Sequence, residues 1–119
     1  MYAIKKPILG FENILTARFQ KIDDVFAILK CENYAFGLIN PFSLIKDYSF
    51  EIPADVKVLL DIKDGDSVYV YAPIVKQEPI KESIVNLKAP IIINPKNNTL
   101  AQIVLDNYGY YKLADFIKE

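Results

Sequence analysis

The side chains of this 119-residue chain that could perform chemistry are carboxylates, lysines, tyrosines and one thiol, because the sequence contains no histidine. The chain therefore lacks the commonest general base and the commonest transition-metal ligand, and it has no Ser-His or Cys-His nucleophile pair. Cys31 is the only cysteine, which excludes an internal disulfide and a multi-cysteine metal site. We interpret Cys31 as a small buried hydrophobic residue within a strand.

Two closely spaced acidic pairs remain as candidates for acid–base catalysis or metal binding: Asp23 with Asp24, and Asp64 with Asp66. Both pairs lie in predicted turns, where neighbouring acids are usually solvated. A calcium loop needs further oxygen ligands at regular spacing and a distant glutamate, which the segment around Asp64 lacks. We therefore expect no catalytic residues, no cofactor and no bound metal, and we do not expect an enzyme. An enzyme that uses one of these carboxylate pairs is the less favoured alternative.

Composition indicates a folded globular chain, with 52% hydrophobic and 24% charged residues. The length suits one domain over residues 1–119. Charges of both signs are interspersed and the net charge is −1, so no large basic field exists and we expect no direct nucleic-acid partner. No apolar run approaches the roughly 20 residues that span a bilayer, and no apolar segment follows Lys5 and Lys6. We expect no membrane association and a cytoplasmic location.

The densest run of β-branched residues, 83–95, is the stretch that organises the predicted elements. Pro90 removes a ladder donor and marks an edge, a bulge or a break before residues 91–93. Turn residues follow, and the chain returns through 100–105, so these two segments most simply form an antiparallel hairpin. Asn86 and Asn94 interrupt this apolar run, and because a buried amide needs partners, we expect both to bond to neighbouring backbone.

Alternating apolar residues and turn signals predict further strands, which cover residues 2–4, 16–22, 25–31, 34–39, 46–52 and 67–75. Residues 25–31 and 34–39 form a hairpin around Glu32 and Asn33. The strand at 67–75 carries apolar side chains on both faces and is expected to be central. The segment 46–52 is expected to bury one face.

Helical spacing occurs in two short stretches. Val56, Leu59 and Leu60 fall at i, i+3 and i+4, which predicts a helix from Ala54 to about Asp61, although a strand at 56–60 stays open. The tail 110–119 places Leu113, Phe116 and Ile117 on one side, either packed on the protein or held for a partner. The expected fold class is mainly β: a small antiparallel β-barrel-like or sandwich domain with one or two short helices.

Four segments, in this order along the chain, resemble the family of the bacterial flagellar assembly factor FliW. The segments are residues 7–12, residues 38–42 followed by 47–53, residues 85–94, and residues 101–106. Together they extend over nearly the whole chain. The residues that carry the family motifs are Gly10, Asn40, Pro41, Asn86, Ala89, Pro90 and Asn94. One departure lies in Tyr108-Gly109-Tyr110, because family members commonly carry a proline after the tyrosine there.

The resemblance implies a single FliW-like β-barrel domain in a cytoplasmic protein of bacterial flagellum biogenesis, with chaperone and translation-regulation roles. It implies two protein partners, the RNA-binding translational repressor CsrA and flagellin. Binding to CsrA antagonises the repressor and relieves repression of flagellin translation, and flagellin binds in a mutually exclusive partner switch.

We predict partner contacts at five apolar or aromatic residues, each of which is alternatively a core residue: Phe11, Phe42, Tyr48, Phe116 and Ile117. We expect the free chain to be a monomer. The alternatives are a homo-oligomeric structural β-domain and a generic protein-interaction module without CsrA binding.

Overall fold

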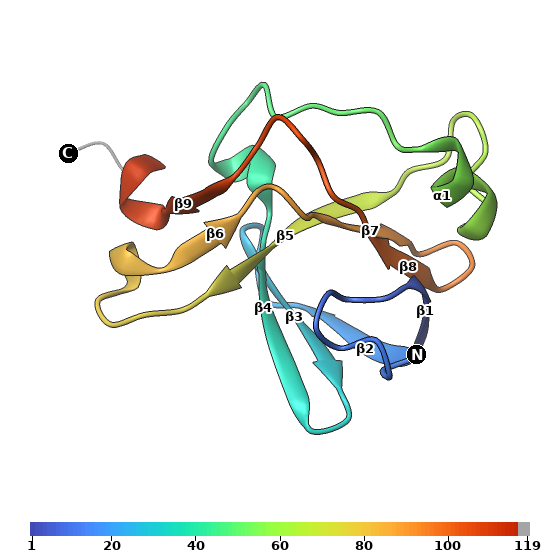
Figure 1. Ribbon diagram of the computed structural model, residues 1–119, viewed down its shortest axis with the longest axis horizontal. Helices are drawn as coiled ribbons and strands as arrows, with labels where there is room; N and C mark the ends of the chain where they lie inside the picture. The colour runs from blue at the N-terminus through green and yellow to red at the C-terminus, as the bar shows by residue number, and fades with distance from the viewer. Residues whose placement is uncertain (117–119) are drawn as a thin grey trace.

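The computed structural model describes residues 1–116 as short strands with one α-helix and three turns of 3-10 helix (Figure 1). The strands are β1 (Tyr2–Lys6), β2 (Thr16–Lys21), β3 (Phe26–Cys31), β4 (Tyr34–Ile39), β5 (Tyr69–Val75), β6 (Ile84–Asn86), β7 (Ile91–Asn94), β8 (Thr99–Gln102) and β9 (Tyr110–Lys112). The helical elements are η1 (Pro41–Ser43), α1 (Ala54–Leu59), η2 (Ile80–Glu82) and η3 (Leu113–Phe116).

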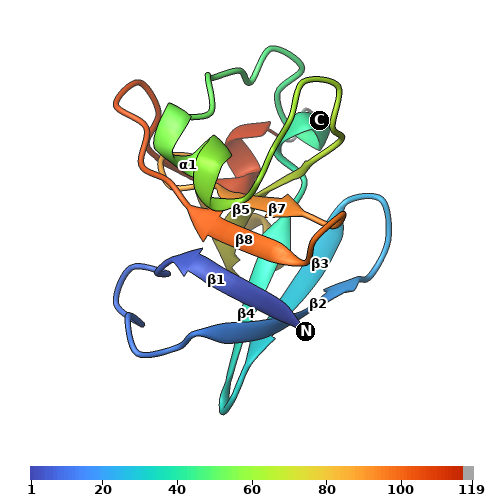
Figure 2. The same cartoon turned by 90° about the vertical axis from the view of Figure 1, so that its right-hand side faces the viewer.

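Seven of the strands close into a barrel. Their order is β4-β3-β2-β1-β8-β7-β5, and the pairing of β4 with β5 completes the ring. β6 pairs with β5 and β9 pairs with β6, so these two strands extend the sheet beyond the barrel. The predicted mainly β, barrel-like fold is confirmed. One pairing departs from the predicted antiparallel arrangement: β1 runs parallel to β8, with Ile4 opposite Leu100 (Figure 2).

Strand β5 is the junction of the sheet, as its two apolar faces predicted. One edge pairs with β7 through residues 69–71 and with β6 through residues 74–75, while the other edge pairs with β4 through residues 72–74. Pro73 has no N–H, and on the edge shared by β6 and β7 it falls in the gap between the two partners. The missing donor therefore costs no ladder bond at that position.

Two clusters of buried side chains form the core, one on each face of the curved sheet. The first fills the barrel and includes Leu29, Leu38 and the predicted buried Cys31. The second packs the outer face of β5 against α1, the extension and the connecting loops. Successive residues of β7 contribute to opposite clusters, with Ile91 and Ile93 in the first and Ile92 in the second. This two-sided burial explains the unbroken apolar run of this strand.

The predicted helix at Ala54–Asp61 is confirmed as α1, and the alternative strand there is wrong. The predicted strand at 46–52 is also wrong, because this segment is turn and irregular extended chain. Pro90 does mark a break, so that only β7 joins β8 in a hairpin while β6 pairs elsewhere.

The tail differs from its predicted helical pattern at its start. Residues Tyr110–Lys112 form strand β9 on the edge of β6, and only Leu113–Phe116 turn helically, as η3. The tail therefore packs on the protein up to Phe116, and Ile117 lies outside the described residues. Within residues 1–116, no helix combines the length and the apolar character needed to cross a membrane.

Candidate functional site

The carboxylates considered for chemistry serve turns in this structure. Oδ1 of Asp23 accepts hydrogen bonds from the backbone N–H groups of Val25 and Phe26 at 2.8 and 2.7 Å. These two bonds stabilise the ionised form and lower the pKa of Asp23. Asp66 accepts a hydrogen bond from the backbone N–H of Lys63 at 2.8 Å. In the described part of the chain, no group of three or more Cys, Asp or Glu side chains lies close enough to hold a metal ion.

The family-motif residues in the first half of the chain shape two turns. Gly10 has φ of +88°, a conformation that residues with a side chain rarely adopt, so it permits the turn between β1 and β2. Asn40 begins η1, and its Oδ1 accepts a hydrogen bond from the backbone N–H of Phe42 at 3.0 Å. Pro41 occupies the first position of that turn, where a missing N–H has no cost, and its side chain is buried.

The motif residues around Pro90 shape the break between β6 and β7. Oδ1 of Asn86 accepts hydrogen bonds from the backbone N–H groups of Lys88 and Ala89 at 3.1 and 3.0 Å. Ala89 is buried and its carbonyl accepts from Nε2 of Gln102 at 2.9 Å. The carbonyl of Pro90 accepts from the backbone N–H of Ile103. The predicted backbone bonding of Asn86 is confirmed.

Asn94 joins the end of α1 to the β7–β8 hairpin. Its Nδ2 donates to the carbonyl of Leu60 at 2.8 Å, and its Oδ1 accepts from the backbone N–H of Lys96 at 3.1 Å. Asn97 donates to the same Leu60 carbonyl at 2.8 Å. The predicted backbone bonding of Asn94 is confirmed, with a partner 34 positions away in sequence as well as a close one.

Gln102 has a bridging role that the sequence reasoning did not single out. Besides its bond to Ala89, its Oε1 accepts from the backbone N–H of Leu9 at 2.8 Å, so one buried amide holds two loops together. A polar amide within the apolar run 100–105 is the signal that could have identified it, by the same reasoning as for the two asparagines.

Two predicted contact residues, Phe42 and Tyr48, lie together in an aromatic cluster. Their ring centroids are 5.9 Å apart, and the ring of Tyr108 lies 4.6 Å from that of Tyr48. Tyr48 is 2% exposed and donates its hydroxyl to the Leu87 carbonyl at 2.8 Å, whereas Phe42 is 46% exposed. Burial first, and then Tyr108, raises the pKa of Tyr48. Phe42 is therefore accessible to a partner, whereas Tyr48 is a core residue that packs against the Phe42 ring. Contact with a partner stays a prediction for both residues.

The other predicted contact residues lie elsewhere. Phe11 is half-buried on the barrel cluster, with edge-to-face contacts to Tyr34 at 4.9 Å and Phe36 at 4.8 Å. Phe116 is half-buried on the second cluster, 5.8 Å from Tyr111. Ile117 falls outside the described residues. The structure therefore brings Phe42 and Tyr48 together and leaves Phe11 on a different core cluster.

We expect Tyr48→Phe to lower the free energy of unfolding by about 1–2 kcal/mol at pH 7, because it removes one buried donor and leaves the Leu87 carbonyl without it. The folded-state pKa of Tyr48 is raised, so its contribution is full below about pH 10 and is lost as the pH rises further. Urea denaturation at pH 7 and above pH 10 tests both effects. The difference from wild type should shrink at the higher pH, and exposed Tyr110→Phe is the control.

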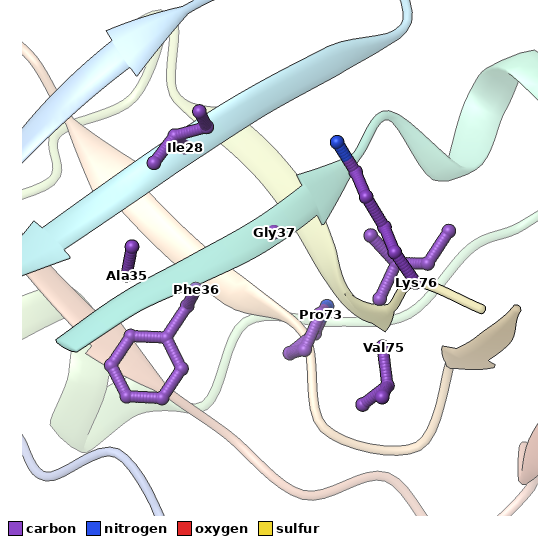
Figure 3. A pocket seen from close by; sticks show the side chains of 8 residues that line it. Ile28, Ala35, Phe36, Gly37, Pro73, Val75 and Lys76 are labelled. Atoms are coloured by element: carbon purple, nitrogen blue, oxygen red, sulfur yellow. The ribbon is translucent and has the colours of Figure 1, made fainter. Parts of the chain in front are cut away.

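Two hollows flank Phe36 and Pro73. The larger, which we term the β4–β5 groove, has a volume of about 420 Å³ and lies where β4 and β5 diverge (Figure 3). It is lined by Ile28, Ala35, Phe36, Gly37, Pro73, Ile74, Val75 and Lys76. A smaller hollow of about 200 Å³ lies between the turn after β1 and β9, and it includes Phe11 and Tyr110. Neither hollow is predicted from the sequence.

These features define a class of protein: a small closed β-barrel with a two-stranded extension, turns fixed by buried amides, and hollows lined mainly by apolar residues. The model of the FliW protein family matches residues 1–115. The chain belongs to the FliW family.

Relatives and a solved structure agree with this membership. The chain is 42% identical to flagellar assembly factor FliW 2 of Wolinella succinogenes, over 98% of this chain and 88% of that protein. It is 37% identical to flagellar assembly factor FliW of Campylobacter lari, over 98% and 95% of the two chains. A crystal structure of the flagellar assembly factor FliW matches with a TM-score of 0.85 and 25% identity, covering 98% of this chain and 86% of the other.

Proposed function

We propose that this protein is a cytoplasmic flagellar assembly factor that binds CsrA and flagellin in turn. The observation that carries the proposal is the family match over residues 1–115, together with relatives of nearly equal length that are named as flagellar assembly factors. The two partners are those that the family resemblance implies. When flagellin is scarce, the protein holds CsrA and relieves repression of flagellin translation. When flagellin accumulates, it takes CsrA's place.

The exchange needs only sites that overlap or are coupled, because mass action then makes flagellin concentration decide which complex forms. Surfaces suited to protein contact support the proposal. The ring of Phe42 is partly exposed, and the buried ring of Tyr48 packs against it. Among residues 1–116, strand β9 pairs only with β6, so its outer edge has main-chain donors and acceptors for a partner, and Tyr110 beside them is exposed.

The test is co-purification of the purified chain with CsrA and with flagellin, each alone, followed by competition between them. We expect each partner to be retained at micromolar concentration and flagellin to displace CsrA. Phe42→Ser, which removes an exposed ring, should weaken one complex or both by about tenfold if this ring is a contact. Val58→Ser, an equally apolar exposed residue on α1, is the matched control.

Retention of neither partner would remove the functional content of the proposal. Light scattering of the chain alone distinguishes the main alternative. A monomer that changes size only with CsrA or flagellin supports the partner switch, whereas a stable oligomer without either supports a structural β-domain.

A further inference from the structure

The edge of β4 is only partly used by the barrel. β5 pairs with residues 37–39 of β4 and then turns toward β6, while β4 itself continues back to Tyr34. The backbone N–H of Asn40 bonds to the carbonyl of Val25, just before β3. The backbone N–H and C=O groups of successive residues in an antiparallel strand point alternately to its two neighbouring strands. The N–H and C=O groups of every second residue before Asn40 therefore also point toward β3. Ala35 therefore directs its N–H and C=O away from β3, past the point where β5 has left.

The floor of the β4–β5 groove is apolar and has room for a side chain. Ile28, Gly37 and Ile74 are successive cross-strand neighbours on β3, β4 and β5. Gly37 carries no side chain, and because a Cβ there would lie 3.0 Å from the carbonyl oxygen of Ile74, the hollow lies beside Gly37, among Ile28, Ala35, Phe36 and the exposed Val75 (Figure 3). Val75 is 61% exposed, an unusual position for a branched apolar residue at the end of a central strand. A branched apolar side chain of a ligand fits this floor.

Two cations lie on β2 and β3, on the β3 side of the groove. Arg18 on β2 lies directly opposite Lys30 on β3, and Lys30 lies opposite Ala35. Like charges directly opposite on neighbouring strands repel, and an anion placed beside them relieves the repulsion. The ion pairs found among residues 1–116 join other lysines to Asp55, Asp66 and Glu82, so neither cation is engaged in them.

Lys76 adds a third positive charge on the opposite side of the groove. Its Cε lies 3.9 Å from the position that a Cβ on Gly37 would occupy, so the aliphatic part of the side chain crosses beside the glycine. Its ammonium lies 5.7 Å from the ring centroid of Phe26. The stem thus forms an apolar wall beside Gly37, and Lys76 as a whole is exposed, so its charge is accessible from solvent.

We propose that the β4–β5 groove binds an extended peptide segment of a partner protein that carries carboxylates beside a branched apolar residue. The segment adds to the edge of β4 at Ala35, places its apolar side chain in the hollow beside Gly37, and directs its carboxylates toward Lys30, Arg18 and Lys76. This site goes beyond the CsrA and flagellin exchange and does not depend on which proteins take part in it.

Other occupants fit the groove less well. A second copy that paired its own β4 edge here would bring Lys30 and Arg18 toward the same two cations, which repel. A nucleic acid would gain few phosphate contacts from three cations around an apolar floor, on a chain of net charge −1.

The probe for this site is a fluorescein-labelled heptapeptide in which aspartate and valine alternate, titrated with the full-length chain and followed by anisotropy. We expect saturable binding that weakens as salt concentration rises. Lys76→Glu should weaken it by about tenfold, since it replaces an attraction by a repulsion. Lys57→Glu, which makes the same charge change on exposed α1, should leave it unchanged. A peptide in which lysine replaces aspartate should bind at least about tenfold more weakly.

A second measurement tests the backbone pairing without any variant. Amide hydrogen exchange of Ala35 should slow when the acidic peptide binds, and N-methylation of alternate peptide amides should abolish both the slowing and the binding. Equal binding of the lysine peptide, no saturable binding, or an unchanged Ala35 amide would overturn the proposal. So would displacement of the peptide by an oligouridine RNA, or peptide-independent dimerisation in sedimentation.

Discussion

Asn94→Asp is expected to lower the free energy of unfolding by about 3 kcal/mol at pH 7, the largest effect of the substitutions considered. The Asn94 side chain is fully buried, and its Nδ2 donates to the Leu60 carbonyl at 2.8 Å. An ionised aspartate of nearly the same shape has no donor, so it places a negative charge against that carbonyl oxygen. The hydrogen bond from residue 94 to the Leu60 carbonyl is lost and a repulsion takes its place, while the bond from Asn97 remains.

The loss should depend on pH in a defined direction. Burial and the facing carbonyl raise the folded-state pKa of the new carboxyl above its unfolded value of about 3.9. The penalty is therefore full above the folded-state pKa and decreases as the pH falls through it, because the protonated acid can again donate to Leu60. Urea denaturation at pH 7 and pH 4 measures this recovery relative to wild type.

Asn97→Asp is the matched control, because Asn97 donates to the same Leu60 carbonyl at the same 2.8 Å but is exposed. We expect it to cost less than about 1 kcal/mol at either pH, since water solvates the charge. Equal losses in the two variants would contradict the argument that burial sets the cost.

The position of Asn94 within an apolar run predicts that its amide needs partners, but it does not identify the distant one. A buried amide must be satisfied wherever it lies, so residue type alone gives the first conclusion. The carbonyl of Leu60 becomes available only because α1 ends beside β7, which is a tertiary arrangement. The same limit applies to the parallel pairing of β1 with β8, in which Ile4 lies opposite Leu100. The spacing of apolar residues along one segment does not indicate which distant strand will pair with it.

The segment 46–52 shows what an alternating pattern does and does not report. Tyr48, Phe50 and Ile52 do face the second core cluster, so the predicted one-sided burial is confirmed. No strand forms, however, because the backbone turns at 46–47 and Tyr48 is fixed through its hydroxyl to Leu87. Alternation reports which side chains are buried, and ladder pairing depends on a neighbouring strand that the segment does not have.

The β4–β5 groove could have been only partly predicted. A glycine within an apolar strand, as at Gly37, marks a close approach or an open space, and this signal was present in the sequence. The groove also needs Ile28 and Val75 from two other strands, and β5 must leave β4 after Ile74 to pair with β6. Pro73 lies where β5 changes its pairing from β7 to β6, so its missing N–H removes no hydrogen bond. This is visible only once the pairing on both edges of β5 is known.

The same glycine leads to the second large effect, because Gly37 lies where β4 meets β5 and completes the barrel. A Cβ there would lie 3.0 Å from the carbonyl oxygen of Ile74 and 3.3 Å from its Cγ2. Ile74 is 4% exposed and is paired on its other side with Val85, so its backbone has little room to move. Gly37 has no positive φ, so the effect of a substitution is steric.

We therefore expect Gly37→Ala to lower the free energy of unfolding by about 2 kcal/mol, after the smaller gain from a stiffer unfolded chain. Gly109→Ala is the control, because the nearest atom to its added Cβ is the Tyr111 hydroxyl at 4.0 Å, and it should change stability by less than about 0.5 kcal/mol. Urea denaturation of both variants measures the difference. If Gly37→Ala were as stable as wild type, β5 could move away from β4 at little cost, and closure of the barrel at this pairing would not be the tight contact that the distances describe.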